Sequence, residues 1–204
     1  MKYIYVIIGK SGVGKDSICS LLLNDPELDL YPIVLHTTRK QRVGEINGVN
    51  YNFVSEEEMN TLIENQLMIE HREYDTTKGK LVYGTSSTAI KDGYSYITIN
   101  TLDGFRRLRE FYSNRADVII VPIYIEVDDY TRITRSIERT NKENVPDFAE
   151  CCRRYLADEE DFNKARVERE IGRHYTVKNN GKLEDTVSRI KNTLIFAQSK
   201  INWA

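Results

Sequence analysis

The chain has 204 residues, and its 29 lysines and arginines nearly balance 31 aspartates and glutamates, giving a formal charge of −2. This length suits one domain, and the balanced charge argues against general binding to nucleic acid or to an anionic membrane surface. The first apolar run, at residues 3–8, is too short for a signal peptide or a membrane span, and no other run approaches about 18 apolar residues, so we expect a cytoplasmic protein.

Segments of strand and helix character alternate along the chain, which predicts an α/β fold with a parallel sheet between two layers of helices. Runs rich in β-branched and aromatic residues indicate strands at 3–8, 32–35, 94–99, 118–125 and 174–177. Helix-like patterns indicate helices at 15–24, 102–113, 128–140, 147–163 and 183–200. Between these elements, residues 37–93 contain short strands with turn signals at Asn47-Gly48 and Lys78-Gly79, which predicts a small, mostly antiparallel insertion.

The first strand leads directly into a glycine-rich stretch. Gly9, Gly14 and Lys15 match the pattern GxxxxGK[ST], in which backbone amides surround a polyphosphate and the lysine reaches its β- and γ-phosphates. A helix-like segment follows, as this motif requires, so we prefer a phosphate-binding loop to a glycine-rich turn that binds nothing. The predicted fold is therefore a three-layer P-loop NTPase fold. The expected ATP-binding residues in this stretch are Gly9, Ser11, Gly12, Val13, Gly14, Lys15, Asp16 and Ser17.

One position of this loop departs from the pattern. Asp16 stands where a serine or threonine hydroxyl normally holds Mg²⁺. A carboxylate can hold Mg²⁺ directly or through water, and Ser17 offers a substitute hydroxyl. We therefore expect Asp16 and Ser17 to be the metal-site residues, with Mg²⁺ as the cofactor that accompanies ATP.

A basic segment at residues 36–54 opens the predicted insertion. Arg39 and Arg42, with the phenol of Tyr51, can form a multi-donor grip on a doubly charged phosphate, whereas a solvated basic loop is the alternative. The segment reads HTTRKQRVGEINGVNYNFV, and it resembles the nucleotide-binding segment of guanylate kinases, whose usual form is S[HS]TTRxPRxGExxGxxYxFV. The resemblance implies that these three side chains bind the phosphate of GMP.

Two further stretches, at 64–71 and 82–86, are similar to the GEFIEW-type strand and the YYG[ST] motif of the same family. The resemblance implies that Glu70 accepts from N1 and N2 of guanine, that Tyr83 contacts the phosphate of GMP, and that Thr85 donates to O6. Adenine lacks the two adjacent N–H donors that one carboxylate can accept together. Leu35 stands where these kinases usually carry a serine that helps to hold O6, so we expect base recognition to depend more on Glu70 and Thr85.

Arginines gather in the second half of the chain. Arg135 and Arg139 lie four residues apart on a predicted helix, and Arg154 lies at the start of the next basic stretch. These stretches resemble the mobile lid of nucleoside monophosphate kinases, which implies that the arginines stabilise the transferring phosphoryl group. Pairing with nearby acids such as Glu159 and Asp161 is the alternative.

Segments near three predicted strands bear on the nucleotide sites. Residues 177–180 resemble the VVND turn of the family, which implies that Asn179 contacts the adenine of ATP. Thr98 and Asn100 replace the acidic residues of the family's LDxD strand, which predicts weaker organisation of Mg²⁺. Residues 75–80 lengthen the hairpin between Glu70 and Tyr83, either adjusting the nucleotide pocket or extending a surface turn.

The resemblance covers nearly the whole chain and implies the reaction ATP + GMP to ADP + GDP, with ATP and GMP as the small-molecule partners. The catalytic residues would be Lys15, Arg39, Arg135, Arg139 and Arg154. The residues that bind GMP would be Arg39, Arg42, Tyr51, Glu70, Tyr83 and Thr85. Two alternatives stay open: a kinase for another nucleotide or a phosphorylated sugar, and a module that binds nucleotides or proteins without catalysis.

We expect one guanylate kinase-like domain over residues 1–204. Its core would comprise about 1–35, 93–127 and 171–204, the nucleotide-binding insertion about 36–92, and the lid about 128–170.

Overall fold

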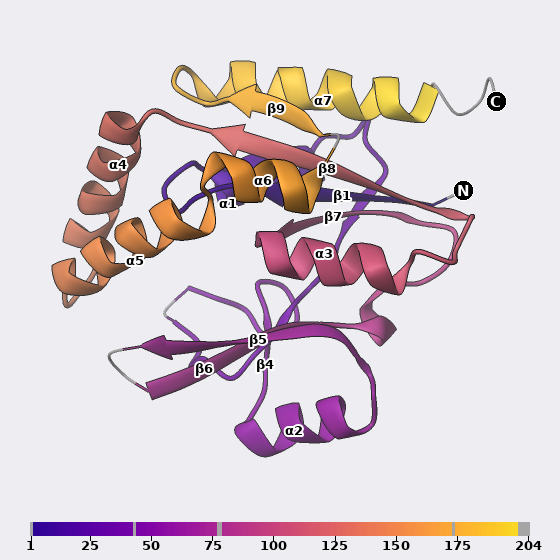
Figure 1. The fold of residues 1–204 in the computed structure, drawn as a ribbon, viewed down its shortest axis with the longest axis horizontal. Coiled ribbons are helices and arrows are strands. Elements are labelled where there is room, and N and C mark those ends of the chain that lie inside the picture. Colours follow the sequence, from indigo (N-terminus) through magenta and orange to yellow (C-terminus); the bar gives the residue numbers. More distant parts are fainter. Residues whose placement is uncertain (1, 43, 77–78, 173, 200–204) are drawn as a thin grey trace.

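The computed structural model describes residues 2–42, 44–76, 79–172 and 174–199. Within these residues the larger sheet has five strands in the order β2-β7-β1-β8-β9, and every neighbouring pair is parallel (Figure 1). Its strands are β1 (Lys2–Ile8), β2 (Leu30–Pro32), β7 (Ser95–Asn100), β8 (Val118–Glu126) and β9 (Tyr175–Lys178). The predicted α/β fold with a parallel sheet between helices is confirmed.

Helices cover both faces of this sheet (Figure 1). On one face α1 (Lys15–Leu23) and α7 (Leu183–Ser199) pack on Tyr5 and Ile7 of β1 through Ile18, Leu22, Ile190 and Leu194. On the other face α3 (Leu102–Phe111) and α6 (Lys164–Ile171) pack on Ile4, Val6 and Ile8. The alternation of apolar side chains along β1 therefore supplies both core layers, as expected of a strand buried on two sides.

The insertion forms a second sheet in the order β4-β3-β6-β5, drawn below the core in Figure 1. Its strands are β3 (His36–Thr37), β4 (Asn52–Phe53), β5 (Met68–Thr76) and β6 (Gly79–Ser86). The β3–β6 and β5–β6 pairs are antiparallel, whereas β3 and β4 are parallel. The predicted turn at Lys78-Gly79 includes Lys78, which lies outside the described residues.

Three segments differ from the predicted elements. The run at 32–35 was predicted to be a strand, but only Pro32 belongs to β2, and residues 33–35 connect the core sheet to β3. Helix α2 (Glu56–Glu64) was not predicted, although Ser55 and Glu58 form a capping box at its start. Helix α6 was also not predicted, because it buries only Val167 and Ile171 and has no continuous apolar face. The short helix η1 (Ser87–Ala89) follows β6.

Two helices project beyond the end of β8, at the left of Figure 1. They are α4 (Asp129–Asn141), begun by the side-chain cap of Asp128, and α5 (Phe148–Asp161), begun by that of Asp147. Both lie within the segment predicted to be a lid. Over the described residues, no helix combines the length and the hydrophobicity needed to cross a membrane.

Candidate functional site

The glycine-rich loop lies between β1 and α1, at the edge of the sheet where the parallel strands end. Gly14 has φ 90° and forms the N-terminal cap of α1 without a side-chain hydrogen bond. The amides of the first helical turn therefore stay available to an anion. Gly12 has φ 81°, and a Cβ atom there would lie 2.5 Å from the Ser136 hydroxyl, so the loop fits closely under α4.

The Lys15 ammonium group lies inside this loop. Its Nζ atom donates to the carbonyl oxygens of Gly9 at 2.7 Å and Lys10 at 2.8 Å. Removal from water lowers the pKa of Lys15, with the charges of Asp16 and Asp158 acting in the opposite direction and that of Arg139 adding to the decrease. The Lys15 ammonium group is thus enclosed by the glycine-rich loop and lies within electrostatic reach of Arg139 on α4.

Two acidic residues from the end of α5 also reach this loop. The Asp158 carboxylate accepts a hydrogen bond of 2.6 Å from the Ser11 amide, and Glu159 pairs with Lys10 at 2.7 Å. The buried guanidinium of Arg132 pairs with both carboxylates and lies over the Tyr155 ring, 3.9 Å from its centroid. The sequence analysis assigned no role to Arg132 or Asp158, because contacts across 147 residues leave no local pattern.

Asn179 lies under the loop. Its side chain donates to the Val13 carbonyl at 2.9 Å and accepts from the Thr186 hydroxyl at 2.9 Å, and the residue is 2% exposed. Arg135, expected over the transferring phosphoryl group, donates to the Asn179 carbonyl at 3.0 Å. Because both polar ends of its side chain are engaged within the protein, Asn179 fixes the loop. The contact of Asn179 with the adenine of ATP stays a prediction.

The insertion brings together the residues expected to hold the phosphate of GMP. Arg39 forms a two-pronged ion pair with Glu45, at 2.7 and 3.0 Å, and its guanidinium carbon lies 5.4 Å from the centre of the Tyr51 ring. The rings of Tyr51 and Tyr83 meet edge to face with 5.8 Å between centroids. Arg42 is exposed, and its amide donates to Glu45 at 2.7 Å. Glu45 is therefore the common partner that positions this group.

Glu70 and Thr85 lie opposite each other on β5 and β6. The Thr85 hydroxyl donates to Glu70 Oε1 at 2.7 Å, and the two residues are each 1% exposed. Arg72 lies beside them, with Nε 3.0 Å from Glu70 Oε2 and Nη1 donating to the Thr101 hydroxyl at 2.7 Å. The expected base-recognition pair is thus assembled, together with a guanidinium that the sequence analysis did not consider.

A cleft of about 630 Å³ lies between the glycine-rich loop, part of the insertion, and helices α4 and α5. The residues that line it do not include Glu70, Arg72 or Thr85. Its walls come from the loop at Ser11, the insertion at Arg39, Arg42 and Tyr83, and the lid at Arg139 and Arg154. Arg154 also pairs with Glu150 at 2.7 Å, so one expected lid arginine has an acidic partner while still lining the cleft. Residues of the glycine-rich loop, of the insertion and of helices α4 and α5 therefore surround one cavity.

Comparisons with known proteins identify the family of this chain. The sequence model of the family described as guanylate kinase matches residues 1–197. The chain belongs to the guanylate kinase family. It is 35% identical over 123 residues to the guanylate kinase of Saccharophagus degradans, covering 58% of each chain, and 31% identical over 138 residues to that of Mycoplasmopsis pulmonis, covering 66% of this chain and 68% of the relative. The chain spans about half the length of most of the curated relatives it matches.

A solved guanylate kinase from Anaplasma phagocytophilum has the same fold. The superposition has a TM-score of 0.66 and covers 97% of this chain and 86% of the other, at 22% sequence identity. At this identity the likeness supports the fold alone.

Two of the departures from the guanylate kinase pattern prove to be buried. Thr98 and Asn100 are 5% and 3% exposed at the end of β7, where the Asn100 side-chain oxygen accepts from the Thr101 amide at 2.9 Å. Asp16 and Ser17 are exposed in the first turn of α1. Among the described residues, no cluster of three acidic, histidine or cysteine side chains could hold a metal. A metal ion here would depend chiefly on the phosphates of a bound nucleotide, which suits Mg²⁺ and the two oxygen donors of this turn.

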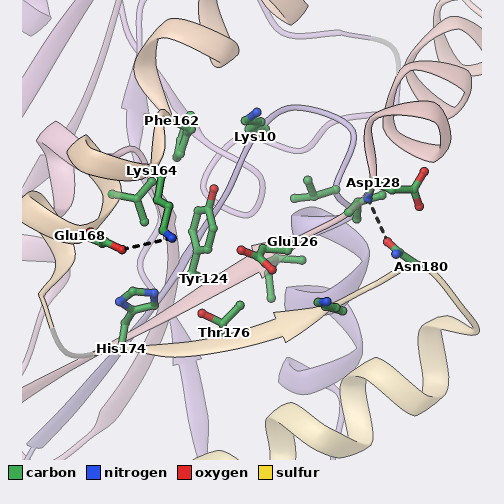
Figure 2. Close-up of a pocket in the computed structure, with 15 residues that line it drawn as sticks. Lys10, Tyr124, Glu126, Asp128, Phe162, Lys164, Glu168, His174, Thr176 and Asn180 are labelled. Carbon is green, nitrogen blue, oxygen red and sulfur yellow. Dashed lines mark hydrogen bonds and ion pairs between the residues drawn. The ribbon is translucent and has the colours of Figure 1, made fainter.

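A second pocket, of about 580 Å³, adjoins the loop at Lys10 and Val13 (Figure 2). It lies between β8, β9 and α6, and its lining residues differ from those of the cleft. Tyr124 lies between Phe162 and His174, with ring centroids 6.3 and 6.0 Å away, and burial raises its pKa to about 12. At the upper right of the view, Asn180 accepts from the Asp128 amide at 3.1 Å. The turn after β9 thus contributes Asn180 to this pocket, while Asn179 supports the adjoining loop.

Proposed function

We propose that this protein transfers the terminal phosphoryl group of ATP to GMP, giving ADP and GDP. The observation that carries the proposal is the cleft that Ser11 of the glycine-rich loop lines together with Arg39, Arg42 and Tyr83 of the insertion. Burial, and next the charge of Asp16, raise the pKa of Tyr51, which means that the loop and the acceptor group lie within electrostatic reach of each other. Two phosphate sites facing one cavity suit direct transfer between two nucleotides.

In this proposal the donor phosphates lie on the amides of residues 9–17, and Lys15 leaves its carbonyl partners to reach the β- and γ-phosphates. Arg39, Arg42, Tyr51 and Tyr83 hold the phosphate of GMP in line with the donor. Arg139 and Arg154 stabilise the charge that spreads over the transferring group, and Arg135 supports the turn at Asn179. The chemistry then consists of positioning and charge stabilisation, without a covalent intermediate.

We also propose Mg²⁺ as the accompanying ion, held by the ATP phosphates with Asp16 or Ser17. Held by Asp16 or Ser17, the ion would supply positive charge that offsets the charge of the phosphates. The region boundaries belong to the same proposal: a core of about 1–35, 93–127 and 171–204, an acceptor-binding insertion of about 36–92, and a lid of about 128–170.

A coupled assay that follows ADP production with GMP, dGMP, AMP, CMP, UMP and a phosphorylated sugar tests the function. We expect GMP to give the highest kcat/KM. Replacement of Lys15 with Ala should lower kcat at least 100-fold through loss of phosphate stabilisation, whereas Lys142→Ala, an exposed lysine at the end of α4, should not. Folded protein that binds ATP and GMP but produces no ADP would instead indicate a non-catalytic nucleotide-binding module.

A further inference from the structure

Arg72 lies on β5 of the insertion, beside the pair formed by Glu70 and Thr85. On β5 it lies two residues after Glu70, and across the hairpin it faces Tyr83, while Glu70 faces Thr85. Its side chain is 12% exposed, so the guanidinium is held within the protein. Arg72 therefore lies between the carboxylate expected to read the base and the tyrosine expected to bind the phosphate.

The contact between Arg72 and Glu70 is close but incomplete. Nε and Oε2 lie 3.0 Å apart, yet within the described residues neither atom has a hydrogen-bond partner of acceptable geometry. Both are buried, and a buried donor or acceptor without a partner costs about 1–3 kcal/mol. The opposite charges offset part of the cost of burying the pair. A ligand that presents one donor and one acceptor side by side would satisfy both atoms.

Guanine presents such a pair, because its N1–H donor is adjacent to the O6 acceptor. Adenine presents the reverse pair, an acceptor at N1 and a donor at the 6-amino group. The other carboxylate oxygen, Oε1, already accepts from Thr85 and has a further lone pair for the 2-amino group of guanine. Leu35 has no donor to offer O6, so an arginine N–H at this edge would supply what the leucine lacks.

We propose that Arg72 donates to O6 of guanine, so that Arg72 and Glu70 together read the O6 and N1–H edge and select 6-oxopurine nucleotides. This inference rests on the proposed function, because it assumes that the acceptor base lies against Glu70. Thr101 holds the guanidinium in place by accepting from Nη1. The assignment makes Arg72 a specificity-determining residue of the acceptor site.

Calorimetric titration with GMP, 6-thio-GMP, IMP and AMP tests the proposal without requiring turnover. In 6-thio-GMP a weakly accepting sulfur replaces O6 while N1–H and the 2-amino group remain. Wild-type protein should prefer GMP to 6-thio-GMP, and Arg72→Leu should reduce that preference about tenfold, as expected from loss of one charge-assisted hydrogen bond. The preference for GMP over IMP, which depends on the 2-amino group and Glu70, should be retained.

Arg115→Leu, which removes an exposed arginine paired with Asp117, is the matched control and should leave all four affinities unchanged. Arg72→Lys keeps the charge but lacks the Nε donor, so it should lose part of the same preference, and it provides the test if Arg72→Leu does not fold. Equal losses for GMP and 6-thio-GMP would overturn the proposal in favour of a role in positioning Glu70. Tighter GMP binding by Arg72→Leu would show that Arg72 obstructs the base.

The outcome separates this inference from the proposed function. If the wild type turns over GMP and Arg72→Leu keeps its preference for GMP over 6-thio-GMP, only the role of Arg72 is wrong. If the wild type binds GMP with the predicted preferences but produces no ADP, only catalysis is wrong. Absence of GMP binding to the wild type would overturn both.

Discussion

The carboxylate of Asp158 lies 2.6 Å from the backbone nitrogen of Ser11, where it accepts a hydrogen bond from the phosphate-binding loop. A carboxylate at this amide repels any phosphate that enters the loop and occupies a hydrogen-bond donor that the phosphate could use. Glu159, beside it on α5, pairs with Lys10 and adds a second negative charge to the same place. Two carboxylates at the end of α5 thus lie against the proposed ATP site.

Asp158→Asn should strengthen the binding of ATP. The substitution removes a negative charge next to the loop but keeps an oxygen that can accept from Ser11, so we expect affinity to rise about threefold to tenfold, as for a charge interaction of about 1 kcal/mol. Calorimetry with a non-hydrolysable ATP analogue measures the change. Asp161→Asn, which alters an acid at the end of the same helix that pairs with Arg166, is the control. Weaker ATP binding by Asp158→Asn would show that the carboxylate supports the site.

Glu45→Gln should weaken the binding of GMP more than that of ATP. The two-pronged pair with Glu45 holds Arg39 beside Tyr51, and the guanidinium in turn lowers the pKa of Glu45. Without that pair we expect KM for GMP to rise about tenfold and KM for ATP to change less than twofold. Steady-state kinetics with each substrate varied in turn provide the measurement, and Glu64→Gln on α2 is an exposed control. Equal changes in both KM values would contradict a role confined to the acceptor.

Thr186→Val should destabilise the phosphate-binding loop from below. The substitution removes the hydroxyl that donates to Asn179, whose amide group supports the Val13 carbonyl. Loss of this buried hydrogen bond should cost about 1–2 kcal/mol and lower Tm by roughly 2–8 °C. Thermal denaturation measures the loss, and KM for ATP should rise with it. Thr193→Val, which removes a solvent-exposed hydrogen bond to the Arg189 carbonyl on the same helix, should change neither quantity.

The pH dependence of stability should depend on Glu150. The Arg153 guanidinium first, and then that of Arg154, hold the pKa of Glu150 down at about 2 from an ordinary value of 4.5. A lowered pKa stabilises the fold at pH values above 4.5, and this contribution is lost as the pH falls towards 2. Glu150→Gln should therefore lower Tm at pH 7, and its difference from the wild type should shrink with acid. A difference that stays constant from pH 7 to pH 3 would contradict this account, and Glu138→Gln is an exposed control.

The sequence correctly predicted those elements that are determined by residues close together in the chain. The strand at 3–8 has apolar side chains on both faces, and Gly9, Gly14 and Lys15 form a short motif, so both features were identified from neighbouring residues. The predicted helix at 183–200 corresponds to α7 up to Ser199, and its residue 200 lies outside the described part of the chain. On that helix Ile190 and Leu194 are buried, whereas Ile195 is 44% exposed.

The remaining features depend on distant parts of the chain. Asp158 meets Ser11, and Arg72 meets Thr101, only after the lid and the insertion have folded against the core. Helix α2 was missed because strand-like runs surround it, although its capping box was present in the sequence. The hairpin at 75–80 continues the β5–β6 pairing to Thr76 and Gly79, and Thr76 and Lys80 line the cleft. This placement beside the cleft favours an effect on the nucleotide pocket over a simple surface turn, and the composition of the segment did not indicate it.

Helix α5 connects the glycine-rich loop to the cleft, because it carries both Asp158, which contacts Ser11, and Arg154. It carries Asp158 about one turn after Arg154, and a helix is stiff over so short a distance. A phosphate that displaces Asp158 from Ser11 must therefore also shift the arginine that lines the cleft. In the proposed reaction, binding of the donor nucleotide at the loop would thereby be coupled through α5 to the position of Arg154 in the cleft.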